Sequence, residues 1–352
     1  MSISTLWYTR CPVLTASSVA IAYGWLEKEF APDGIEVLSL LHSTDRGIRE
    51  SHFSHHSPNS FRHGGSIPPI WARANGGETR VIGLTWTETP YFVLTSSESQ
   101  INSPLDLARK RLALPRRQKD SIDFARAMYL RVYEQALSSV GLTLSDVEIV
   151  DLPVEEGYLD ASSAPSRDGA LWNASQLRGF QRTEILALIR GEVDAIPSSG
   201  YWGAEHVAAL GLRVVYDSRA AADLAARVNS GNPSILSVSA ALVDTRPDLV
   251  TRWVACLLKA AQWGRANPSG TVRVAARECG VAEAFVEANS TEGHDSHLDI
   301  DLSDVHTASL EAQKRYLFDR GVIERDFDVE KWLVREPLDN ALQQIKLAPR
   351  TL

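Results

Sequence analysis

A strand–helix–strand succession at the start of the chain is the feature that most limits its fold. Residues 2–8 are rich in β-favouring side chains, and residues 35–41 form a second apolar run of strand length. Between them, residues 15–30 carry apolar side chains at helical spacing, and a Pro-Asp-Gly turn follows at 32–34. A strand, a helix and a second strand in this order predict an α/β sheet.

The rest of the chain continues the alternation of strands and helices. Helices are expected at 121–140, at 179–191 and from Arg246 to about residue 265. Residues 153–176 are polar and contain scattered Gly, Ser and Pro, which predicts a long functional or mobile loop. A chain of 352 residues suffices for one large domain or two medium ones. Short apolar runs of strand length stand at 80–85, 91–94, 111–114, 147–150, 193–196, 212–216 and 235–238.

Charge and hydropathy exclude two classes of partner. The net charge is −8 and no long basic run is present, which argues against nucleic acid. No stretch approaches the roughly 18 apolar residues of a membrane span, so no membrane partner is expected. The first residues lack the basic leader and apolar core of an export signal, and the odd number of cysteines, 3, suggests no disulfide framework. We therefore expect a cytoplasmic protein with free thiols.

A cysteine and several polar residues near the N-terminus predict a thiol site that holds a small oxyanion. Cys11 follows the first strand, and the proline after it suits a first helical position, so we expect Cys11 at or beside a helix N-cap. The helix dipole there, together with a protonated His52, would favour a thiolate. Arg62 can bind two oxygens in one plane. The backbone N–H groups of Gly64 and Gly65 can approach an oxyanion closely, because no Cβ is in the way.

Each of these residues also has a purely structural interpretation. A single cysteine is most often a small buried hydrophobe, and we predict that role for Cys256 and Cys279. His52, His55 and His56 have a spacing that binds metal on a helix, but the surrounding Ser, Pro and Asn argue against a helix. No metal is therefore expected, and the latter two histidines are predicted to be solvated. The arginines at 116–117 are likewise predicted to face water.

Three longer segments resemble the solute-binding proteins for aliphatic sulfonates, taurine and nitrate. They are 101–114, 190–195 with its Gly-Glu-Val-Asp-Ala string, and 246–268. The resemblance implies a two-lobed periplasmic-binding-protein-like (type II) α/β fold with a ligand cleft between the lobes. Lobe I would then comprise residues 1–107 and a return with the C-terminal helices at 218–352, and lobe II residues 108–217. Tyr201 and Trp202 directly follow a lobe II strand, and we expect them to line the cleft.

The segments that contain the oxyanion-site residues resemble a more specific family. Residues 11–17, 52–53 and 62–69 resemble the corresponding stretches of the aryl-sulfinate desulfinases. The resemblance implies Cys11, His52 and Arg62 as catalytic residues and a backbone N–H of Gly65 on the sulfinate. It also implies hydrolysis of a carbon–sulfur bond with release of sulfite and without a cofactor. Thr9 can add a hydroxyl at the same turn. Residues 115–119 and 153–176 differ from that family's apolar aryl pocket, which leaves the organic part of the substrate open.

Two hypotheses of function follow from the sequence. The first is a desulfinase acting as a monomer on a small-molecule organic sulfinate, with an aryl sulfinate as the expected type. In it, Cys11 either attacks the sulfinate sulfur as a thiolate or protonates the carbon that bears sulfur. The second is a non-catalytic solute-binding protein of the ABC-transporter type for a sulfonate or a thiamine-precursor-like molecule. A binding protein predicts an export or anchor signal and has no need for a cysteine in its cleft.

Overall fold

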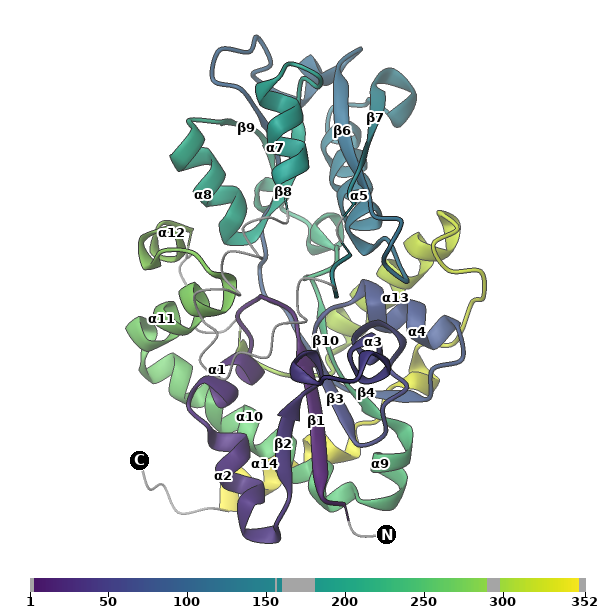
Figure 1. The fold of residues 1–352 in the computed structure, drawn as a ribbon, viewed down its shortest axis with the longest axis vertical. Coiled ribbons are helices and arrows are strands. Elements are labelled where there is room, and N and C mark those ends of the chain that lie inside the picture. The colour runs from purple at the N-terminus through teal and green to yellow at the C-terminus, as the bar shows by residue number, and fades with distance from the viewer. Residues whose placement is uncertain (1–2, 156, 160–180, 290–297, 348–352) are drawn as a thin grey trace.

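The chain folds into two lobes, each built on its own β-structure and flanked by helices (Figure 1). The computed structural model describes residues 3–155, 157–159, 181–289 and 298–347. The chain begins in the lower lobe of Figure 1, crosses to the upper lobe after β4, and returns before β10. The predicted two-lobed α/β architecture is therefore observed.

Lobe I contains a five-stranded sheet with the order β2-β1-β3-β10-β4. The three strands from the N-terminal region run parallel, whereas β10 is antiparallel to both of its neighbours. The returning strand therefore lies between β3 and β4, and its insertion ties the C-terminal third of the chain to the N-terminal third. The strands are β1 (Thr5–Arg10), β2 (Glu36–Ser39), β3 (Ser60–Gly65), β4 (Thr79–Thr85) and β10 (Ser234–Ser239).

Lobe II contains two smaller sets of strands. β5 pairs antiparallel with β8 and β9, β6 pairs parallel with β7, and a bridge between Leu112 and Ala195 connects the two sets. The lobe boundaries at 107/108 and 217/218 stay a prediction; the sheet pairing itself changes between β4 and β5 and between β9 and β10. The elements of this lobe are β5 (Tyr91–Thr95), β6 (Arg111–Arg116), α5 (Phe124–Ser138), β7 (Glu148–Pro153), α7 (Arg182–Ile189), β8 (Ile196–Ser199), α8 (Gly200–Leu210) and β9 (Arg213–Asp217).

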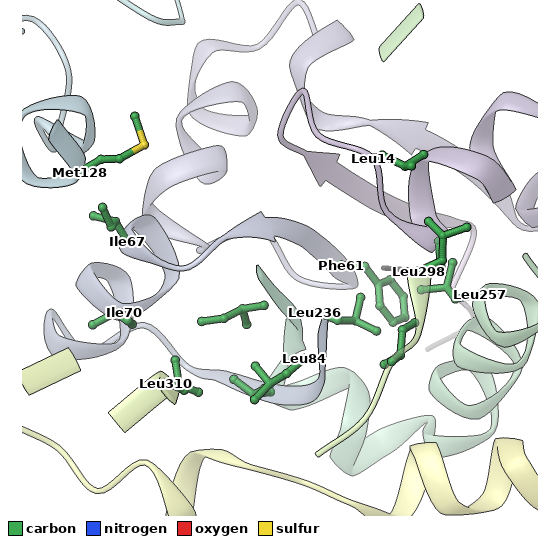
Figure 2. Close-up of a cluster of buried hydrophobic side chains, with 14 of the residues drawn as sticks. Leu14, Phe61, Ile67, Ile70, Leu84, Met128, Leu236, Leu257, Leu298 and Leu310 are labelled. Atoms are coloured by element: carbon green, nitrogen blue, oxygen red, sulfur yellow. The ribbon is translucent and has the colours of Figure 1, made fainter. Parts of the chain in front are cut away.

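The larger hydrophobic cluster lies between the lobe I sheet and its helices and continues into lobe II through residues of β6 and α5. Phe61 of β3 stacks on Trp253 of α10 with ring centroids 4.0 Å apart, and Figure 2 shows Phe61, Leu84 and Leu236 within this cluster. Cys256 is buried in α10, as expected for a core residue. The helices of this lobe are α1 (Ala16–Ala22), α2 (Trp25–Phe30), α3 (Arg46–Ser54), α4 (Ile67–Ala74), α9 (Ala240–Thr245), α10 (Pro247–Ala266), α11 (Pro268–Cys279), α12 (Glu283–Asn289), α13 (Asp304–Asp319) and α14 (Glu336–Leu347).

The first helix differs from its prediction at both ends. Thr15 is the N-cap of α1 and accepts a hydrogen bond from the Ser18 backbone N–H, so Cys11 lies four residues before the cap rather than beside it. The helix ends at Ala22, because Gly24 adopts φ 64° and starts a separate helix. A helix dipole acts mainly within its terminal turn. It therefore contributes little at Cys11.

The histidine-rich segment also differs from its prediction, because α3 continues to Ser54 despite the polar residues around it. Asp45 caps this helix by accepting a hydrogen bond from the Gly47 backbone N–H. The helix places His52 and His55 in the interior, at 2% and 6% exposed, whereas His56 is exposed. The prediction of a solvated loop is therefore wrong for His55. Among the described residues, no helix is long and apolar enough to cross a bilayer.

Candidate active site

A cavity of about 140 Å³ lies between the lobes, and Cys11 is in its wall. Lobe I contributes the segment after β1, residues of α3 and the end of β3. Lobe II contributes residues of α5 and α8 and Tyr158. The two segments on which the chain crosses between lobes, at Thr87–Pro90 and around Ser230, complete the wall. A ligand here would contact both lobes.

The sulfur of Cys11 has a guanidinium group behind it. Arg62 on β3 is only 3% exposed, its Nη2 donates a hydrogen bond to the Cys11 Sγ at 3.3 Å, and its Nη1 donates to the Gly65 carbonyl at 2.9 Å. The backbone of Cys11 is itself held by a hydrogen bond to the His63 carbonyl. Arg62 is not in the cavity wall. Arg62 therefore acts on the cavity from behind the half-buried sulfur of Cys11. Its positive charge stabilises negative charge on or next to that sulfur.

The two glycines after Arg62 permit this close packing. A Cβ on Gly64 would stand 2.6 Å from the Cys11 Sγ, and a Cβ on Gly65 would stand 2.5 Å from the Ser230 Oγ. Any side chain at either position would therefore push the cysteine or the crossing segment away. Gly65 lines the cavity, whereas Gly64 packs behind the thiol. The donation of a Gly65 N–H to an oxyanion stays a prediction.

His52 is neutral in this site, so the prediction of a protonated imidazole is wrong. Burial, together with the nearby Arg62 charge, lowers the pKa of His52 to about 3. Its Nδ1 lies 2.6 Å from the Thr9 Oγ1, and its ring stacks on Tyr158 at a centroid distance of 5.3 Å. Thr9 is buried beneath the cavity wall and its hydroxyl is engaged by the imidazole. Thr9 therefore orients His52, and its contact with a ligand stays a prediction.

His63, which follows Arg62 on β3, has a structural role on the other face of the strand. His63 is 2% exposed, and its ring nitrogens lie 2.9 Å from the Ser17 Oγ and 3.2 Å from the Thr85 Oγ1. Burial, followed by the Arg62 charge, lowers the pKa of His63 to about 3. Because strand residues alternate between faces, Arg62 and His63 point in opposite directions, and only Arg62 is next to the thiol.

The lobe II wall brings aromatic residues to the thiol. Tyr201 and Trp202, at the start of α8, both line the cavity. Trp202 Nε1 donates a hydrogen bond to the Cys279 carbonyl at 2.7 Å, which connects lobe II to lobe I. The Cys279 Sγ in turn lies 3.2 Å from the carbonyl of Pro12, the residue after Cys11. Cys279 is thus buried as predicted, and it also lines the cavity.

Several residues of the wall were not predicted from the sequence. Phe124 and Met128 of α5 line it, and so does Tyr158, which belongs to a segment whose polarity predicted a loop. Arg117 was expected to face water but is 6% exposed, beside Asp120 at 3.8 Å. Most of the predicted 153–176 loop lies outside the described residues. Within the described part of the chain, no group of three or more potential metal ligands is found.

Comparison with solved structures defines the class of fold. No family model matches the chain. The periplasmic aliphatic sulphonate binding protein SsuA from Escherichia coli superposes with a TM-score of 0.64 at 15% identity, covering 95% of this chain and 93% of that one. At this identity the likeness concerns the fold alone. The fold is thus the periplasmic-binding-protein fold, as predicted.

A more specific similarity is to one enzyme. The 2'-hydroxybiphenyl-2-sulfinate desulfinases of Rhodococcus erythropolis and Rhodococcus qingshengii are each 26% identical over 363 residues, covering 97% of this chain and 94% of the relative. The structure of desulfurization enzyme DSZB matches with a TM-score of 0.74 at 25% identity. Its cysteine-to-serine variant in complex with biphenyl-2-sulfinic acid matches with a TM-score of 0.73, covering 97% of this chain and 99% of that one. The predicted resemblance to the aryl-sulfinate desulfinases is confirmed.

Proposed function

We propose that this protein is a desulfinase that hydrolyses the carbon–sulfur bond of an organic sulfinate. The observation that carries the proposal is the Cys11 thiol, placed in an inter-lobe cavity with the buried Arg62 guanidinium 3.3 Å from its sulfur. Similarity to a sulfinate desulfinase over 97% of the chain supports it. A solute-binding protein shares the fold but has no use for a thiol paired with a guanidinium.

The overall reaction consumes one water. The sulfinate R–SO2⁻ and water give the hydrocarbon R–H and bisulfite, so the carbon–sulfur bond breaks, the carbon gains a proton and the sulfur gains an oxygen. Arg62 is permanently charged and can pair with a sulfinate oxygen next to Sγ. Gly65 lines the same wall, and its backbone N–H would add a hydrogen bond to the anion. This arrangement binds the anion with its sulfur facing the thiol.

The contact between Arg62 and Cys11 supports attack by a thiolate. On this route, Sγ bonds to the sulfinate sulfur and the leaving carbon takes a proton from water; hydroxide then releases bisulfite and restores the thiolate. Protonation of carbon by Cys11 would instead need the sulfur to hold a proton while it accepts the Arg62 N–H. An SO2 adduct on Cys11 is expected in protein quenched during turnover. If sulfite forms rapidly with no such adduct, carbon protonation is the better account.

The cavity wall supports an aromatic or otherwise apolar organic group on the substrate. Phe53, Phe124, Met128 and Trp202 line the cavity along with the thiol. Burial of an aromatic group among them is favourable by a few kcal/mol, at about 25 cal/mol per Å². Within this proposal the enzyme acts as a monomer in the cytoplasm. A buried apolar cluster that runs through both lobes of one chain supports the first statement, and the need for a reduced thiol supports the second.

The proposal is tested by measuring sulfite released by the purified protein. The substrates are 2'-hydroxybiphenyl-2-sulfinate, benzenesulfinate, a short alkyl sulfinate and the matching sulfonates. Sulfite and the desulfinated arene are expected in equal amounts from the aryl sulfinates, and none from sulfonates. If no sulfinate yields sulfite while a sulfonate binds tightly in calorimetry, the protein is a binding protein instead.

A further inference from the structure

A second, much smaller cavity is lined by Arg62 but not by Cys11. It has a volume of about 10 Å³ and is lined mainly by residues of β1, α3, β3, β4 and β10. Arg62, His55 and Ser239 line it, and they are 3%, 6% and 6% exposed. Roughly 10–15 Å³ is the smallest volume that holds one water molecule. The cavity is therefore of the size of a single water.

Three buried polar atoms of residues that line this cavity have no hydrogen-bond partner within the described part of the chain. They are the Nε of Arg62, the Nε2 of His55 and the Oγ of Ser239. Four other hydroxyls in its wall already have partners: Thr9 with His52, Ser51 with the Ser57 N–H, Ser60 with the Ser57 carbonyl, and Thr79 with Trp332. A buried polar group left unpaired costs about 1–3 kcal/mol. Three such atoms around one small cavity indicate a shared partner.

The donors and acceptors fit one water molecule. Arg62 Nε–H can only donate. The His55 ring makes a hydrogen bond to the His52 backbone, and burial holds the pKa of His55 well below its usual value, so the ring is neutral. The proton of that ring is used in the backbone bond, which leaves Nε2 as an acceptor. A water oxygen accepts from Arg62, while its two hydrogens serve His55 and the Ser239 hydroxyl.

We propose that a buried water bonded to Arg62 Nε, His55 Nε2 and Ser239 Oγ holds the guanidinium in the plane that faces the Cys11 thiol, and that His55 is thereby a positioning residue for the oxyanion. The inference rests on the proposed function for its substrate. The remaining nitrogens of Arg62 are already fixed, Nη1 on the Gly65 carbonyl and Nη2 on Sγ. With the water in place, all three sides of the guanidinium are bonded. A chloride ion would not serve, because His55 Nε2 offers it no proton.

The consequence is that a residue outside the substrate cavity affects binding of the anion. Without the His55 acceptor, the water loses a partner and Arg62 Nε loses its fixed position. The guanidinium can then tilt away from the sulfur. Binding of an anion next to Cys11 should weaken, while uncharged molecules should enter the cavity as before.

The test compares His55→Phe with His55→Gln, and uses His56→Phe as a matched control. Both substitutions at position 55 keep a non-glycine residue at φ 57°, so backbone strain is common to them. Only the glutamine retains a polar atom that can reach the water. His56 is exposed at the next position and does not line the small cavity. Ser239→Ala removes a different partner of the same water and serves if His55→Phe does not fold.

The first readout is alkylation of Cys11 by iodoacetate, an anion, and by neutral iodoacetamide, followed by mass spectrometry of the Cys11 peptide. The ratio of the two rates reports anion binding beside the thiol and requires no desulfinase activity. We expect the ratio to fall about tenfold in His55→Phe, to recover largely in His55→Gln and to stay unchanged in His56→Phe. A ratio unchanged in both His55→Phe and Ser239→Ala overturns the positioning role.

The second readout is a high-resolution crystal structure of the wild-type protein. Density for one water within hydrogen-bond distance of the three atoms is expected, and empty density or a chloride ion there overturns the water site. In sulfite-release assays, His55→Phe should raise KM for sulfinate and change kcat much less. A wild-type protein that releases no sulfite, but whose alkylation ratio falls in His55→Phe, would refute the desulfinase function and leave this inference standing.

Discussion

The two walls of the active-site cavity differ in what they are made of. The lobe I wall carries Cys11 and His52, and each is hydrogen-bonded to a buried polar residue behind the wall, Cys11 to Arg62 and His52 to Thr9. The lobe II wall consists of large apolar or aromatic side chains from α5 and α8 and of Tyr158. Within the proposed function, this difference assigns the chemistry to lobe I and recognition of the organic group to lobe II.

The two lobes also differ in their buried titratable groups. Lobe I contains three buried neutral histidines, His52, His55 and His63, whose pKa values are lowered by burial and by Arg62. Lobe II contains Glu184, which is 1% exposed and whose pKa is raised to about 7, chiefly by burial, and one further histidine, His206, whose pKa burial lowers to about 4. The histidines around the oxyanion site are therefore unprotonated near pH 6, whereas the carboxyl of Glu184 in lobe II holds a proton there.

The largest effect expected from these buried groups is a fall in the free energy of unfolding as the pH is lowered. The folded pKa of each of these four histidines is below its unfolded value of about 6.5, so the unfolded chain binds protons that the folded chain does not, and stability falls as the pH drops below about 6.5. Each contributes about 1.4 kcal/mol per pH unit. Glu184 works in the opposite sense, because its folded pKa is above its unfolded value. We expect a net loss of about 3 kcal/mol per pH unit near pH 6.

Urea unfolding at about pH 7.5 and about pH 5.5 measures this loss, and two variants assign it to the lobes. His63→Gln should make the pH dependence shallower, because one neutral histidine is removed. Glu184→Gln should make it steeper, because the compensating carboxyl is removed. Equal unfolding free energies at the two pH values in the wild type would contradict the claim that the buried histidines are neutral in the folded protein.

The next effect is on the chemistry of the lobe I wall. Arg62→Lys keeps a positive charge but cannot bond the Gly65 carbonyl, the Cys11 sulfur and an anion together. We expect kcat/KM for sulfinate to fall by about 10–100-fold, mostly through KM, because hydrogen bonds to a charged group are lost. Arg80→Lys, on β4 of the same sheet, is the control and should be near wild type. Unchanged kinetics in Arg62→Lys would remove Arg62 from the site.

The smallest effect concerns the lobe II wall. Trp202→Phe retains an aromatic surface but loses the hydrogen bond from Nε1 to the Cys279 carbonyl. We expect KM for a biaryl sulfinate to rise about fivefold, the equivalent of about 1 kcal/mol. A short alkyl sulfinate does not fill this wall and should be turned over as by the wild type. If both substrates lose activity equally, Trp202 acts on the thiol rather than on recognition.

The difference between the walls also explains what the sequence could predict. The lobe I site was predictable because Cys11, His52 and Arg62 lie within about fifty residues, at the ends of elements whose apolar patterns are clear. Their side-chain types carry the chemistry and have few alternative uses in combination. The strand–helix–strand start likewise predicted the α/β fold.

The remaining features depend on packing that no local pattern encodes. The protonation of His52 is set by its burial beneath Tyr158, a residue more than a hundred positions away. The N-cap of α1 lies at Thr15 rather than next to Pro12 because Thr15 and Ser18 form the capping hydrogen bonds. Phe124 and Met128 reach the cavity only because the chain crosses between lobes after β4 and returns before β10. Single apolar residues on a helix give no sign of such an approach.

The central claim, that lobe I performs carbon–sulfur hydrolysis through Cys11, is tested most directly by two serine variants. Sulfite release from 2'-hydroxybiphenyl-2-sulfinate is measured for the wild type, Cys11→Ser and Cys279→Ser. Cys279 lines the same cavity but does not contact Arg62 in the described structure, which makes it the matched control. We expect Cys11→Ser to lose activity about a thousandfold or more and Cys279→Ser to retain most of it. Sulfite release by Cys11→Ser at the wild-type rate would contradict the account.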